Sequence, residues 1–198
     1  MQGFRRVSEE ELLRAWLFRV DRLHVVDPTG TPFDRVVMRH PGAVTVVPLH
    51  SDGTVTMVRQ YRAAVDAMVL EMPAGTLDQP GEPALDAGRR ELAEEVGLQA
   101  AHWELLIEAW NSPGVSDQRT VIYLATGLTP CASNPHGIEE QAMTVEAVHL
   151  DEVDRLVADG TLRDETTVLG LYLTRARVSA TGAWSGGTSG PESPGPRR

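Results

Sequence analysis

Four glutamates and two arginines lie in a short stretch between two glycines. The stretch, residues 75–98, reads GTLDQPGEPALDAGRRELAEEVGL, and its candidates for chemistry are Glu82, Arg90, Glu91, Glu94 and Glu95. In a helix, Glu91 shares a face with Glu94 and Glu95, which are three and four positions further on. Oxygen ligands of this kind are those that Mg²⁺ and Mn²⁺ prefer. The spacing therefore indicates a site for a divalent metal ion.

The positions of the acids within the expected helix strengthen this interpretation. Pro83 suits a first turn and Gly97 a left-handed position after the last, so we expect a helix of about 13 residues. Acids near a helix C-terminus are disfavoured by ~0.3 to 1 kcal/mol per charge unless a cation compensates. The alternative is a solvated surface helix with its acids partly neutralised by arginines. Gly88, inside the helix, predicts close packing of another backbone.

Composition limits the partners and the compartment. The 198 residues carry a net charge of −10, which argues against nucleic acid or an anionic membrane as the general partner. The lone Cys131 fits a reducing compartment. The N-terminus has no apolar secretion signal, and no apolar run approaches the ~20 residues that span a bilayer. We expect a soluble, cytoplasmic protein.

The strands and helices that must position these acids can be predicted from alternating or β-branched apolar stretches and from turn residues. We expect a β-hairpin over 16–40, with its turn at 27–30, and later helices over 151–160 and about 165–178. Further strands are expected over 43–50, 54–61, 67–73, 119–125 and 143–150. This order favours an α/β fold, an α/β/α sandwich around a mixed sheet. The expected division is an N-terminal hairpin region over 1–40, a main domain over 41–178 and a disordered tail over 179–198.

The charged stretch resembles the signature of the Nudix hydrolases. From Glu82 the run E-PALDAGR-RE-L-A-EE-V-G-L matches every fixed position of that signature through Leu98. The departure lies upstream, because six residues separate Gly75 from Glu82 where the common pattern has five. Pro80 and Gly81 suit a turn, so we expect the loop to bulge by one residue, with Glu82 still reaching Arg90.

The resemblance implies roles for the signature residues. Glu91 and Glu95 are expected to bind Mg²⁺, or alternatively Mn²⁺, with the main-chain carbonyl of Ala74, and Glu94 is a shared or second ligand. The resemblance further implies that Glu82 and Arg90 form an ion pair and orient Glu91. Residues that hydrogen-bond a metal ligand commonly fix its orientation in this way.

Residues outside the signature are expected to supply the general base and the substrate contacts. By resemblance, the base is a glutamate of the loop 133–145, either Glu139 or Glu140, with Glu140 preferred. Arg62, and less strongly Arg35, should bind the substrate phosphates or the adenosine half, and Glu71 should hydrogen-bond the substrate.

The segments HPGAVTVVPL, MVRQYR, LEMPAGTLD and SPGVSDQRTVIYLATGL resemble those of ADP-ribose pyrophosphatases. The implied function is Mg²⁺-dependent hydrolysis of ADP-ribose to AMP and ribose 5-phosphate, by a homodimer with exchanged N-terminal hairpins. Two alternatives stay open. One is a hydrolase of another nucleoside diphosphate derivative, such as a nucleotide sugar, and the other is a regulator that binds ADP-ribose without hydrolysis.

Overall fold

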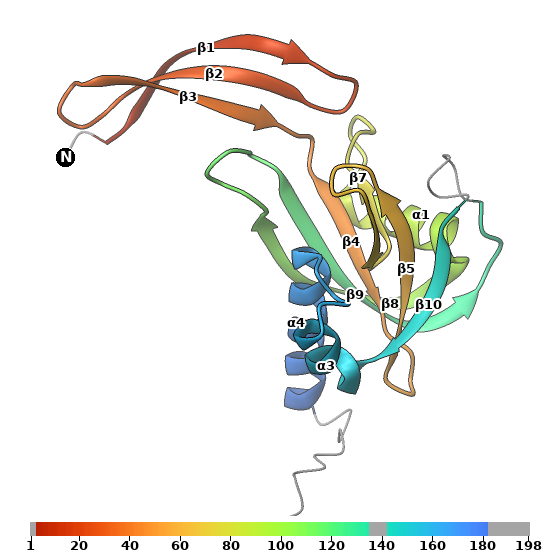
Figure 1. Ribbon diagram of the computed structural model, residues 1–198. Coiled ribbons are helices and arrows are strands. Elements are labelled where there is room, and N and C mark those ends of the chain that lie inside the picture. Colours follow the sequence, from red (N-terminus) through yellow and green to blue (C-terminus); the bar gives the residue numbers. More distant parts are fainter. Residues whose placement is uncertain (1–2, 135–141, 182–198) are drawn as a thin grey trace, which may run out of the picture.

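Two sheets and two layers of helices form the main body of the chain, and a separate sheet extends from it (Figure 1). The structure, a computed structural model, describes residues 3–134 and 142–181. No helix within these ranges is long and apolar enough to cross a membrane.

A four-stranded mixed sheet lies at the centre of the body. Its order is β7 (Ala74–Thr76), β4 (Ala43–Pro48), β9 (Arg119–Pro130) and β8 (Leu98–Trp110), with β4 and β9 parallel. A second sheet has the order β10 (Thr144–His149), β5 (Thr54–Arg62) and β6 (Ala67–Glu71). The link at residues 51–53 therefore connects strands that belong to different sheets. The strand β8 has no counterpart among the predicted strands.

Helices pack on both faces of the central sheet. Val46 of β4 packs with Leu92 of helix α1 (Ala84–Val96), whereas the next residue, Val47, belongs to the larger core cluster with Leu171 of helix α4 (Glu165–Thr181). The 3-10 helix η1 (Leu150–Glu152) and helix α3 (Val153–Ala158) complete the α4 side. Because successive strand residues point to opposite faces, this packing confirms the predicted α/β sandwich.

Helix α1 begins and ends where the sequence predicts, but its internal glycine has a different role from the one expected. The helix starts directly after Pro83, and Gly97 takes the left-handed conformation with φ 63°. The expectation for Gly88 was wrong: a Cβ there would meet the side chains of Val44 and Val46 at 3.2 and 3.4 Å, not another backbone. Further on, α4 continues to Thr181, three residues past the predicted end.

The N-terminal sheet consists of β1 (Arg5–Arg14), β2 (Arg19–Val26) and β3 (Pro32–Arg39) and projects away from the body (Figure 1). The strands β2 and β3 are the predicted hairpin. The third strand, β1, was not predicted, because every one of its residues is exposed and its sequence therefore carries no alternation. Cross-strand ion pairs support it instead, such as Glu10 with Arg22 at 2.9 Å.

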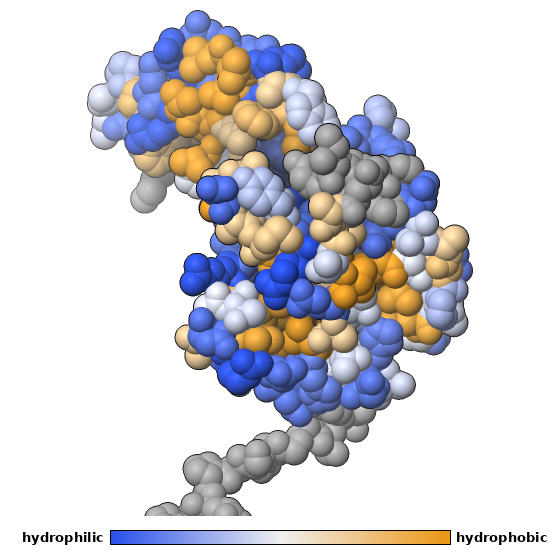
Figure 2. Space-filling model, turned by 45° about the vertical axis from the view of Figure 1, so that its right-hand side comes forward, coloured by the Kyte–Doolittle hydropathy of each residue, from blue (hydrophilic) through white to orange (hydrophobic). Residues whose placement is uncertain are grey.

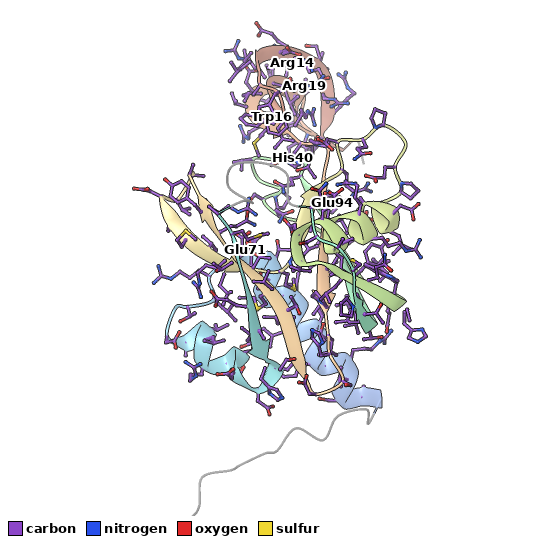
Figure 3. The ribbon with its side chains drawn as sticks, turned by 90° about the vertical axis from the view of Figure 1, so that its right-hand side faces the viewer. Arg14, Trp16, Arg19, His40, Glu71 and Glu94 are labelled. Atoms are coloured by element: carbon purple, nitrogen blue, oxygen red, sulfur yellow. The ribbon has the colours of Figure 1, made fainter. Side chains whose placement is uncertain are left out.

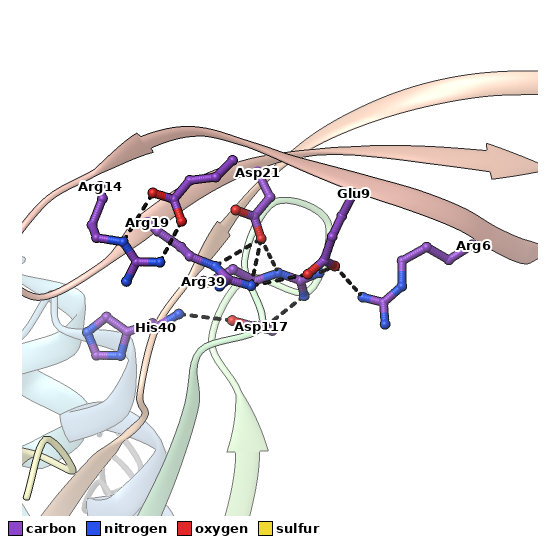
Figure 4. Close-up of polar contacts among 9 residues, drawn as sticks. Arg6, Glu9, Arg14, Arg19, Asp21, Arg39, His40 and Asp117 are labelled. Atoms are coloured by element: carbon purple, nitrogen blue, oxygen red, sulfur yellow. Dashed lines mark hydrogen bonds and ion pairs between the residues drawn. The ribbon is translucent and has the colours of Figure 1, made fainter. Parts of the chain in front are cut away.

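Arg39 joins the N-terminal sheet to the body (Figure 4). Its guanidinium donates hydrogen bonds to Asp21 of β2 at 3.0 Å, to Glu9 of β1 at 3.1 Å and to Asp117 of the body at 2.9 Å. Asp117 also accepts a hydrogen bond from the main chain of His40 at 3.0 Å. One side chain thus ties two strands of the sheet to the loop before β9.

Candidate active site

Arg90 holds three glutamates of the signature together. Its Nε and Nη2 donate to the two carboxylate oxygens of Glu82 at 3.2 and 3.1 Å, and its Nη1 donates to Glu91 at 2.7 Å and to Glu94 at 3.2 Å. The hydrogen bonds to Glu82, followed by the charge of Glu91, raise the pKa of Arg90 above its ordinary value despite burial. Arg90, which the resemblance predicts to orient Glu91, therefore contacts the carboxylate of Glu91 directly.

The loop between Gly75 and Glu82 ends in a turn directly before Glu82. The main-chain N of Glu82 donates to the carbonyl of Gln79 at 3.1 Å, with Pro80 and Gly81 between them. Gly81 has φ 81°, which suits glycine at this place in a type II turn. The six-residue spacing is therefore compatible with the ion pair between Glu82 and Arg90.

Two of the signature carboxylates, those of Glu91 and Glu95, lie against β7. Glu91 lies against Gly75 so closely that a Cβ on that residue would overlap the carboxylate. Glu95 accepts a hydrogen bond from the main-chain N of Ala74 at 3.0 Å. The residues predicted as metal ligands, Ala74, Glu91 and Glu95, are therefore neighbours at the junction of α1 and β7.

The charge and chemistry of this junction fit a hard divalent cation. Glu91 and Glu95 are only 9% and 6% exposed, and Arg90 supplies one positive charge against Glu82, Glu91 and Glu94. Negative charge therefore exceeds positive charge among buried oxygen donors, which favours binding of Mg²⁺ or Mn²⁺. Within the described ranges, no three acidic, histidine or cysteine side chains already converge in a metal-binding arrangement. The Ala74 carbonyl, Glu91, Glu95 and Glu94 would hold the ion.

A cavity of about 1020 Å³ adjoins the junction. Ala74 and Gly75 form part of its wall, and Leu17 and His40 border it from the side of the N-terminal sheet. In Figure 3, His40 lies between that sheet and the body. Glu71 on β6 and Glu94 on α1 lie below it in the same view. A volume at the upper end of the range for small-molecule sites suits an extended ligand.

Arg62 and Glu71, both predicted to bind substrate, line this cavity and bind each other. Arg62 donates from Nε at 3.0 Å and from Nη2 at 2.5 Å, and Glu71 also accepts from Gln60 at 3.3 Å. Hydrogen bonding to Glu71 and its charge raise the pKa of Arg62. The arginine thus stays charged while one side of its guanidinium is occupied.

One predicted substrate contact is not gathered here. Arg35 lies on β3, with its guanidinium 4.6 Å from the ring centroid of Phe33, and is not part of the cavity wall. Glu139 and Glu140 lie outside the described residues. Their roles stay predictions.

Two arginines of the cavity wall were not singled out by sequence. Arg59 of β5 lies three residues before Arg62, and Arg163 precedes α4. Only the packing of α4 against the central sheet brings Arg163 to the cavity, so no local pattern could indicate it.

Comparisons with known proteins agree with this geometry. The model of the NUDIX domain matches residues 38–168. The chain is 36% identical over 173 residues to the ADP-ribose pyrophosphatase of Mycobacterium tuberculosis, covering 87% of this chain and 84% of that one. It is 34% identical over 155 residues to the methanol dehydrogenase activator of Bacillus methanolicus, covering 76% and 83%. A crystal structure of an ADP compounds hydrolase superposes with a TM-score of 0.79 at 25% identity, over 93% of this chain and 98% of that one. This chain therefore belongs to the Nudix family and is a Nudix pyrophosphatase.

Proposed function

We propose that this Nudix pyrophosphatase hydrolyses ADP-ribose to AMP and ribose 5-phosphate with Mg²⁺, or alternatively Mn²⁺. The observation that carries the proposal is the contact of Glu91 and Glu95 with Gly75 and Ala74, which form part of the wall of the cavity of about 1020 Å³. The similarity to an ADP-ribose pyrophosphatase over 87% of the chain supports this substrate.

The acids and their partners explain how the site would act. A divalent ion, when bound, neutralises phosphate charge and lowers the pKa of bound water. Glu82 and Arg90 fix the position of Glu91, and the main chain of Ala74 fixes that of Glu95. Such preorganisation means that the carboxylates need little rearrangement when the substrate arrives.

The general base is proposed to be Glu140, with Glu139 as the alternative. Carboxylates that bind a metal ion are poor proton acceptors, so the base should come from outside the signature. Glu140→Gln should lower turnover by about 10²-fold or more. An unchanged rate in Glu140→Gln with a loss in Glu139→Gln would transfer the role to Glu139.

Arg62 is proposed to bind a substrate phosphate with its remaining donors, and Glu71 is proposed to hold Arg62 in position as well as to bind the substrate. A guanidinium has five N–H donors, of which Glu71 accepts the one on Nε and one of the two on Nη2. Arg35 is proposed as a contact to the adenosine half.

A cytoplasmic homodimer with exchanged N-terminal hairpins is the proposed form of the enzyme. Figure 2 shows apolar residues gathered on the N-terminal sheet. The exposed large apolar side chains of this sheet and the residues next to its strands are Phe4, Val7, Leu12, Leu13, Trp16 and Val36. Exposed apolar patches of this kind mark contact surfaces. Light scattering at assay concentration should give twice the chain mass, and a monomer would contradict this form.

A substrate panel tests the function. The protein is incubated with ADP-ribose, nucleotide sugars including GDP-mannose, and dinucleotides, in Mg²⁺ or Mn²⁺, and the products are identified. The proposal predicts the highest kcat/KM for ADP-ribose, with AMP and ribose 5-phosphate as products. Preference for a nucleotide sugar would select the alternative substrate class.

A further inference from the structure

Three arginines line the cavity, and two of them are already paired with acids. Arg59 binds Glu146 through two hydrogen bonds at 2.6 and 3.1 Å, and Arg62 binds Glu71. The third, Arg163, has an exposed side chain and forms no ion pair or side-chain hydrogen bond within the part of the chain that the structure describes.

The backbone on both sides of Arg163 is fixed. Leu162 is 3% exposed, and its main-chain N donates to Leu156 at 2.9 Å. Asp164 accepts a hydrogen bond from the main-chain N of Thr167 at 2.7 Å, and the Thr167 hydroxyl accepts one from the main-chain N of Met72 at 3.1 Å. These bonds tie the start of α4 to the segment between β6 and β7. Arg163 therefore projects from a defined position.

Gly160 leaves room for the guanidinium of Arg163. It follows α3 with φ 76°, and a Cβ there would lie 3.0 Å from Nη2 of Arg163. The guanidinium therefore lies close to the backbone of Gly160 at the cavity wall. This placement needs no acidic partner.

We infer that Arg163 binds the diphosphate group of the substrate, an inference that rests on the proposed function. A nucleoside diphosphate brings negative charge into a cavity whose wall also includes Glu71, Asp164 and Glu165, in a chain of net charge −10. Arg59 and Arg62 are already partly neutralised by their carboxylates, whereas Arg163 would exchange only water for the phosphate. The planar guanidinium matches two phosphate oxygens, which favours the diphosphate over neutral ribose hydroxyls.

Arg163→Gln tests this contact, because loss of a binding contact should change KM and leave kcat nearly unchanged. The KM for ADP-ribose should rise about tenfold, the value of one charge-assisted hydrogen bond, with kcat changed less than about twofold. Arg163→Lys should recover part of the affinity, because it restores the charge without the planar fork. Arg155→Gln is the matched control, since Arg155 is an exposed arginine of α3 paired with Glu152 and Asp159. An unchanged KM in Arg163→Gln, or an equal rise in Arg155→Gln, would overturn the inference.

Calorimetry with ADP separates this inference from the proposed function. If the wild-type protein does not cleave ADP-ribose, the proposed function fails, but ADP binding in EDTA still reports on Arg163. We expect Arg163→Gln to bind ADP about tenfold more weakly than wild type. Equal affinities, or no binding of ADP to wild type, would contradict an anion contact at Arg163.

Discussion

The carboxylate of Glu91 occupies the space that a side chain on Gly75 would need. Gly75 is not among the glycines with positive φ, so it does not serve as a left-handed turn residue. Its missing side chain instead lets α1 approach β7 closely enough to bring Glu91 beside the strand that carries the Ala74 carbonyl. Gly75, the first glycine of the signature, therefore allows α1 and β7 to approach closely, whereas Gly97 allows the chain to turn at the end of α1.

Gly75→Ala should displace Glu91 and lower kcat by about 10²-fold, because small misplacements of catalytic groups have effects of that size. The fold should persist, since the collision involves a side chain that can rotate. Turnover and the melting temperature are measured together. Gly114→Ala is the control, because a Cβ there meets nothing within 4 Å. Full activity in Gly75→Ala would show that Glu91 tolerates displacement.

Local patterns predicted α1 well because its ends and its acidic face depend on short-range chemistry. Pro83 and Gly97 fix the ends, and the spacing of Glu91, Glu94 and Glu95 alone places them together. The β-branched run of β4 and the partly alternating stretches of β2 and β3 likewise predicted these strands, and the order of strands and helices predicted the sandwich.

Features that depend on contacts between distant segments were not predictable in this way. The wholly exposed β1 is supported by ion pairs to the neighbouring strand, not by burial. Gly88 faces Val44 and Val46 because of how α1 crosses β4, and Arg163 reaches the cavity because α4 packs on the central sheet. None of these contacts leaves a periodic signal in the sequence.

Glu95→Gln should lower turnover by at least about 10²-fold and raise the Mg²⁺ concentration for half-maximal activity. The amide oxygen of Gln can still accept the hydrogen bond from the main chain of Ala74, so the melting temperature should stay close to that of wild type. Glu108→Gln removes an equal charge from an exposed ion pair with Arg119 and should leave activity unchanged. Removal of divalent ions with EDTA should abolish wild-type turnover. Full activity of Glu95→Gln in Mg²⁺ would refute its role as a ligand.

Arg90→Lys should lower kcat by about 10- to 100-fold, the usual effect of losing a residue that orients a metal ligand. Lysine keeps the charge but cannot bind Glu82, Glu91 and Glu94 in the same forked geometry. Arg89→Lys is the control one position earlier, where the arginine pairs with Asp86 at the exposed surface. Steady-state kinetics compare the two variants. Similar kcat values in both would mean that charge alone, without the fork, positions Glu91.

The stability of the fold should fall as the pH decreases from about 7.5 to 5.5, because of His40. Burial lowers the pKa of His40 below its ordinary value, although the charge of Asp117 opposes the shift. The unfolded chain, with a histidine pKa of about 6.5, therefore takes up a proton at a pH where the folded chain does not. The contribution of His40 to the free energy of unfolding is fully present above pH 6.5 and is lost as the pH falls towards the folded pKa.

His40→Asn tests this origin of the pH dependence. Nδ1 of His40 accepts a hydrogen bond from the main chain of Gly42 at 3.0 Å, and an asparagine oxygen can accept the same bond two residues on. The variant keeps the turn but has no titrating ring, so its free energy of unfolding should change less than that of wild type between pH 7.5 and 5.5. Urea denaturation at several pH values measures the difference. His102→Asn, on an exposed position of β8, should keep the wild-type dependence. An identical pH profile for wild type and His40→Asn would place the titrating group elsewhere.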